Sequence, residues 1–120
     1  MTDSETLART IAAAALDKKA GDLVVLDMRG LSSFTDFFLI ASANSEPQLK
    51  AITGGIRERV RDDLAKKPLS EDGFPVSQWV VLDYGDVIVH LFRDEKRRYY
   101  ALEDLWSDAP RLEIGADVPA

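Results

Sequence analysis

The stretch WVVLDYGDVIVHLF, Trp79 to Phe92, decides the fold, because two apolar runs flank the centre Asp83-Tyr84-Gly85-Asp86. Apolar runs on either side of a short glycine-containing turn predict a β-hairpin. A two-residue turn at Tyr84-Gly85 would pair Leu82 with Val87, Val81 with Ile88, Val80 with Val89, and Trp79 with His90. Trp79 and His90 would then stand side by side on one face, whereas a three-residue loop would shift the register by one.

The chain before the hairpin predicts a helix and two strands. Thr2-x-x-Glu5 is a capping box that opens the helix, and Gly21 is in the position of a C-terminal cap. The helix has a buried stripe consisting of Leu7, Ile11, Ala14 and Ala15. Residues 23–28 and 37–43 are apolar runs that predict strands buried on both faces, joined by a loop.

A second helix is predicted after these strands. Ser45-Glu46-Pro47-Gln48 forms a capping box with proline in the first turn, and Pro68 stops the helix. Its apolar stripe consists of Leu49, Ile52, Ile56, Val60 and Leu64. Gly54 and Gly55 lie mid-helix, where each costs about 1 kcal/mol relative to alanine. Either close packing against the sheet or a functional kink would account for them.

The remaining segments complete the predicted order of helix, strand, strand, helix, hairpin and helix. Residues 68–78 predict a polar loop, and residues 97–106 predict a short helix with Leu102, Leu105 and Trp106 turned inward. We expect a single domain over residues 1–106 and a frayed tail over residues 107–120. Continuous apolar strands need helices over both faces, so the fold class is α/β or α+β layered with a small mixed sheet.

Composition limits the possible partners. The chain has no cysteine and no apolar run near the ~20 residues of a spanning helix, so we expect a cytoplasmic location. A net charge of −6 disfavours non-specific nucleic-acid binding and suits a basic protein partner. Basic clusters at residues 18–19, 57–61 and 96–98 are interleaved with acids, which is typical of a solvated face. A small nucleic-acid-binding module using residues 93–98 stays an alternative.

Catalytic motifs are scarce. His90 is the only histidine, and neither a nucleophile elbow nor a phosphate loop accompanies it. It could be a general base, or a histidine satisfied within the sheet. Four aspartates near strand ends could gather magnesium, although aspartate beside glycine is common in turns; they are Asp27, Asp36, Asp83 and Asp86. No cofactor or metal is expected, and an enzyme using Asp27, Asp83 and Asp86 with magnesium stays the alternative.

Four segments together resemble the ribosomal silencing factor (Iojap-like) family, from about Ala20 to Ala109. They are LDMRGLSSFTDFFLIASANS, QLKAI, WVVLDYGDVIVHLF and RRYYALEDLW. The resemblance implies a fold similar to nucleotidyltransferases without their chemistry. It also implies binding to large-subunit ribosomal protein fourteen, which blocks small-subunit joining and represses translation when nutrients are short. The chain departs from the family at the inserted Asp72 and at Gly54-Gly55.

The resemblance favours a docking face on the hairpin, although Trp79 alone would read equally as a core residue. We expect partner-binding residues Trp79, Asp83, His90, Arg98, Tyr99 and Glu103, because a central aromatic is typical of protein interfaces. A homodimer is also expected, from family members that pair and from an apolar sheet with few helices to cover it.

Overall fold

The computed structural model describes residues 3–31, 33, 35–73, 79–93 and 109–112. In these residues two helices accompany a five-stranded sheet. The elements are α1 (Ser4–Asp17), β1 (Gly21–Asp27), β2 (Phe37–Ala43), α2 (Glu46–Leu64), β3 (Ser70–Asp72), β4 (Trp79–Asp83) and β5 (Val87–Arg93). Neither described helix is long and apolar enough to cross a membrane.

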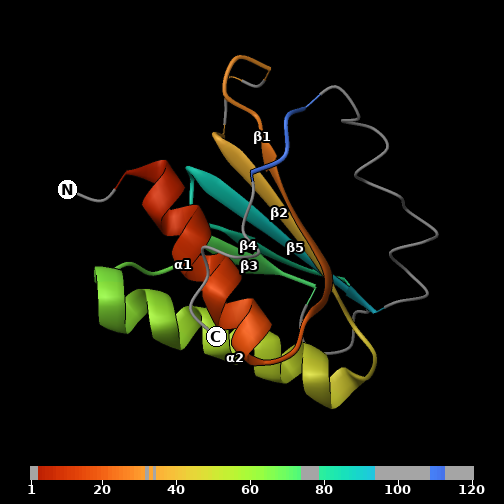
Figure 1. The fold of residues 1–120 in the computed structure, drawn as a ribbon. Coiled ribbons are helices and arrows are strands. Elements are labelled where there is room, and N and C mark those ends of the chain that lie inside the picture. The colour runs from red at the N-terminus through yellow and green to blue at the C-terminus, as the bar shows by residue number, and fades with distance from the viewer. Residues whose placement is uncertain (1–2, 32, 34, 74–78, 94–108, 113–120) are drawn as a thin grey trace.

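The sheet is mixed, with strand order β1-β2-β5-β4-β3. The central strands β2 and β5 run parallel, and every other neighbouring pair is antiparallel. The predicted α+β fold with a small mixed sheet is therefore confirmed. Helices were expected on both faces, but α1 and α2 both pack on the same one (Figure 1). The helix expected over residues 97–106 lies outside the described residues.

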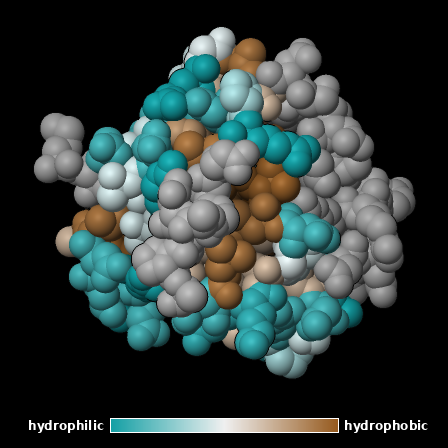
Figure 2. Space-filling view, in the orientation of Figure 1, coloured by the Kyte–Doolittle hydropathy of each residue, from teal (hydrophilic) through white to brown (hydrophobic). Residues whose placement is uncertain are grey.

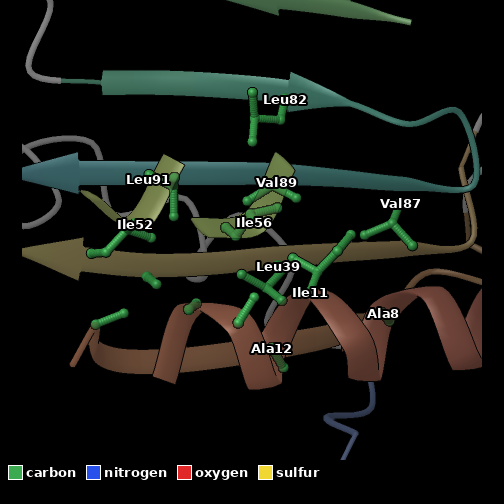
Figure 3. Packing of buried hydrophobic residues seen from close by; sticks show 14 of the residues in the cluster. Ala8, Ile11, Ala12, Leu39, Ile52, Ile56, Leu82, Val87, Val89 and Leu91 are labelled. Carbon is green, nitrogen blue, oxygen red and sulfur yellow. The ribbon is translucent and has the colours of Figure 1, made fainter. Parts of the chain in front are cut away.

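The main core lies between these helices and the sheet. Ile11 and Ala12 of α1 and Ile52 and Ile56 of α2 point toward the sheet, where they meet Leu39 and neighbouring strand residues (Figure 3). All five are fully buried, as the helical apolar stripes predicted. The solvent-facing surface along α2 is hydrophilic, at the lower edge of the view in Figure 2. Burial of one stripe on each helix therefore fixes which sheet face is covered.

Both ends of α1 differ from the prediction. The N-cap is Asp3, whose Oδ1 accepts the Thr6 N–H at 2.7 Å, because a carboxylate one residue further along offers a strong acceptor. The helix ends at Lys18 rather than at Gly21, and Lys19 adopts a φ of 65°. The Ala20 N–H then donates to the Ala15 carbonyl at 3.0 Å in a Schellman motif. Gly21 instead begins β1.

The hairpin register also differs from the prediction. Trp79 lies opposite Phe92 and Val81 lies opposite His90, two residues away from the expected register. The turn is Gly85-Asp86, flanked by a bond from the Tyr84 N–H to the Val87 carbonyl at 2.9 Å. Gly85 has a φ of 86°, the conformation that the first central residue of a type II′ turn requires. A shift of two keeps every side chain on its expected face.

The outer strands were not fully anticipated. β1 is an edge strand whose Leu23 and Val24 are only half-buried, so the expected burial of both faces is wrong for it. β3 lies within the expected polar loop, because its pairing with β4 supplies what its own sequence does not. The described part of the expected frayed tail is held against the outer edge of β1. There the Asp27 N–H donates to the Pro110 carbonyl at 2.7 Å, and the Leu112 N–H donates to the Val25 carbonyl at 2.8 Å.

The two mid-helix glycines do not pack against the sheet, which corrects that expectation. A methyl group at Gly54 would meet no heavy atom within 4 Å, whereas one at Gly55 would meet Lys18 Cγ and Cε at 3.2 Å. Lys18 belongs to the end of α1, so the close neighbour is a flexible side chain.

Gly54→Ala is therefore expected to raise the free energy of unfolding by about 1 kcal/mol, because alanine removes the helical cost of glycine without a clash. Urea unfolding measures it, with Gly55→Ala as the matched control. The gain at Gly55 should be smaller, since the Lys18 side chain must move aside. Equal gains at both positions would contradict this account.

Candidate functional site

An aromatic cluster lies on the sheet face opposite the helices, and it consists of Phe38, Trp79, His90 and Phe92. The rings of Trp79 and Phe92 stack with centroids 5.0 Å apart, and Phe38 meets His90 edge-on at 5.3 Å. Phe92 and Phe38 are buried, while Trp79 and His90 remain half-exposed. The expected placement of Trp79 and His90 on one face is confirmed, although they lie diagonally rather than directly opposite.

A hydrogen bond fixes the two half-exposed rings. The Trp79 Nε1–H donates to His90 Nδ1 at 3.2 Å. An accepting Nδ1 requires the neutral imidazole with its proton on Nε2. Burial agrees, since it lowers the pKa of His90 from 6.5 to about 4. His90 is therefore a neutral structural acceptor near pH 7, which matches the satisfied sheet histidine rather than a general base.

The aspartates that could have gathered magnesium are used locally. Asp83 Oδ1 accepts the Gly85 N–H at 2.7 Å, so it shapes the turn. Both Asp27 oxygens accept from the Arg29 guanidinium, at 2.9 and 2.7 Å. This partner holds the pKa of the Asp27 carboxyl below its ordinary value. Within the described ranges, no three acidic or histidine side chains come together to hold a metal ion.

The structure brings together only part of the expected docking set. Trp79 and His90 are in contact, and Asp83 ends the same strand as Trp79, on the same face. Arg98, Tyr99 and Glu103 lie outside the described residues. Sequence reasoning did not include Phe38 and Phe92 in the site. The alternation along the hairpin could have indicated Phe92, but Phe38 joins only through the β2–β5 pairing.

This arrangement defines a small α+β domain that presents a fixed aromatic pair, which is the chemistry of a binding protein. Residues 1–119 match the family described as ribosomal silencing factor during starvation. A Bacillus subtilis ribosomal silencing factor is 39% identical over 112 residues, with 93% of this chain and 94% of the relative covered. One from Halalkalibacterium halodurans is 43% identical over 98 residues, with 82% and 83% covered.

Solved structures agree. A crystal structure from Bacillus halodurans superposes with a TM-score of 0.79 at 38% identity, covering 91% of this chain and 98% of its own. One from Chromobacterium violaceum gives 0.84 at 24% identity, covering 98% and 96%, and supports the fold alone. The chain belongs to the ribosomal silencing factor family. Its members repress translation as non-enzymatic proteins that bind large-subunit ribosomal protein fourteen.

Proposed function

We propose that this chain silences ribosomes by docking its aromatic face onto large-subunit ribosomal protein fourteen, so that the small subunit cannot join. Translation would then fall when nutrients are short. The docking residues would be Trp79, Asp83 and His90, together with Arg98, Tyr99 and Glu103. A cytoplasmic location fits this role, because translating ribosomes must be within reach.

The observation that carries this proposal is the fixed orientation of Trp79. Its ring is stacked on Phe92 and its N–H is bonded to His90, yet part of its surface stays open to solvent. An aromatic side chain that is held in place before binding loses little conformational entropy when a partner covers it. The net charge of −6 also favours encounter with a basic ribosomal protein.

The test has two readouts with purified components. The chain should sediment with isolated large subunits, and adding it before small subunits should reduce the yield of joined ribosomes on a sucrose gradient. Adding it after joining should have less effect, because its docking surface is then covered. Normal joining at saturating concentrations of the chain would refute the proposal.

We also propose a homodimer for the free protein. The sheet face that carries the aromatic cluster is covered by no helix within the described residues, and β3 is an open edge with one described neighbour. Exposed edges and apolar faces favour a partner. Sedimentation equilibrium at tens of micromolar should give twice the 13.3 kDa chain mass. A monomer mass under those conditions would contradict the dimer without affecting the docking proposal.

A further inference from the structure

A hollow of about 570 Å³ lies between the C-terminal half of α2 and strand β3. We call it the α2–β3 groove. Cationic side chains from α2 and from the segment that follows it line the hollow, and these are Arg57, Arg61, Lys66 and Lys67. Two acidic side chains, Glu58 and Glu71, oppose them. The groove is therefore locally basic in a chain whose net charge is −6.

Part of this positive charge is committed to weak ion pairs. Arg57 Nη1 contacts the Glu71 carboxylate at 3.1 Å, and Arg61 Nε contacts Asp62 at 3.1 Å. All four side chains are largely exposed, so each pair contributes ~1 kcal/mol at most and can exchange partners. The ammonium groups of Lys66 and Lys67 form no ion pair with any carboxylate of the described chain.

The cations follow a row. Arg57 and Arg61 are one helical turn apart, roughly 6 Å along the axis. Lys66 and Lys67 continue the row where the chain leaves α2 after Ala65, which has a φ of 56°. A row of cations along a groove is the arrangement by which proteins track a nucleic-acid backbone. A lysine pair after a helix has a local explanation in the helix dipole, but that explanation covers neither the arginines nor the hollow.

Gly54 adds a second, independent observation. It lines the groove, and a methyl group there would meet no heavy atom within 4 Å. Packing therefore does not require glycine at this position, although glycine costs the helix stability. Its missing side chain keeps the hollow open.

We propose that the α2–β3 groove binds phosphate groups of the RNA backbone on the large ribosomal subunit. The inference rests on the proposed function, because docking onto a large-subunit protein brings the chain beside ribosomal RNA. The groove and the aromatic face meet at one edge of the sheet, since β3 pairs with β4 and β4 carries Trp79. RNA flanking the docking protein is therefore within reach. Ribosomal proteins are mostly basic, so an acidic peptide is the less suitable occupant.

The first test removes charge. Binding of the full chain to a fluorescein-labelled single-stranded RNA of about 20 nucleotides is measured by anisotropy across a potassium chloride series. We expect Lys66→Gln/Lys67→Gln to weaken binding several-fold and to reduce the salt slope by about 2, one for each lost phosphate contact. The control Lys18→Gln/Lys19→Gln makes the same change in net charge elsewhere. Equal loss in both variants, or tighter binding to polyglutamate than to RNA, would overturn the inference.

The second test fills the hollow without changing charge. Gly54→Leu should weaken RNA binding, whereas Ala51→Leu adds the same side-chain atoms at an exposed position of α2 that does not line the groove. Unchanged RNA binding in Gly54→Leu would overturn the inference.

Binding to isolated ribosomal protein fourteen separates this inference from the proposed function. The lysine variant should bind that protein as wild type does, while losing affinity for whole large subunits. A wild-type chain that binds RNA but not the ribosomal protein would refute the proposed function alone. A chain that binds the protein but shows no groove-dependent binding to RNA would refute the inference alone.

Discussion

Trp79→Ala is expected to weaken binding to isolated large subunits by roughly thirtyfold or more, because truncating a central aromatic anchor costs about 2 kcal/mol or more. The chain should then leave the large-subunit fraction, and subunit joining should recover. Co-sedimentation over a concentration series measures the loss. The indole makes most of its contacts through one half-exposed ring, so alanine removes both the contact surface and the N–H donor.

The same substitution also costs stability, since it removes the stacking on Phe92. Val80→Ala is the matched control, because Val80 is the next residue of β4 and is fully buried on the opposite face. Urea unfolding first establishes that both variants are folded under the binding conditions. Val80→Ala should bind large subunits as wild type does. Equal binding losses in both variants would show that Trp79 acts through stability and that the docking face lies elsewhere.

Acidification from pH 6.5 to pH 4 is expected to remove about 3 kcal/mol of stability through His90. Burial lowers its pKa to about 4 in the folded chain, against 6.5 for an exposed histidine. Between these values the unfolded chain binds a proton that the folded chain does not. Stability is therefore fully present above pH 6.5 and falls as the pH decreases toward 4. Protonation of Nδ1 would also break its bond from Trp79.

The measurement is unambiguous because His90 is the only histidine in the chain. The chemical shift of its Cε1 proton, followed by NMR, reports the pKa directly, and urea unfolding across the pH range reports the stability. His90→Gln keeps an acceptor for the Trp79 N–H and does not titrate. Carboxylate titrations contribute equally to both chains, so the difference between their pH profiles isolates the imidazole. An imidazole pKa near 6.5 in the folded protein would contradict this account.

The fold was predictable wherever burial leaves a periodic signal. β2 was predicted with its observed bounds, because all seven of its residues are apolar or small and all are buried. The stripe of α2 was predicted equally well, since one helical face packs and the other is solvated. β3 carried no such signal, because Ser70, Glu71 and Asp72 are all exposed and become a strand only by pairing with β4.

The site was predictable in its face but not in its detailed contacts. Alternation along β4 and β5 placed Trp79 and His90 together, and a register error of two residues preserves that face. Turn chemistry caused the error, because Gly85 occupies the first turn position instead of the second. Phe38 could not be assigned to the cluster, since its place depends on which distant strand β2 pairs with.

The parallel pairing of β2 with β5 has a consequence for how this chain is synthesised. Phe37 lies beside Val87, fifty residues later in the chain. At about 5–20 residues per second, β5 follows β2 out of the ribosome after roughly 3 to 10 seconds. The β1–β2 hairpin and α1 can assemble earlier, because their contacts are local. Throughout that interval the apolar inner edge of β2 awaits its partner, so β2 is the strand most open to mispairing in a nascent chain.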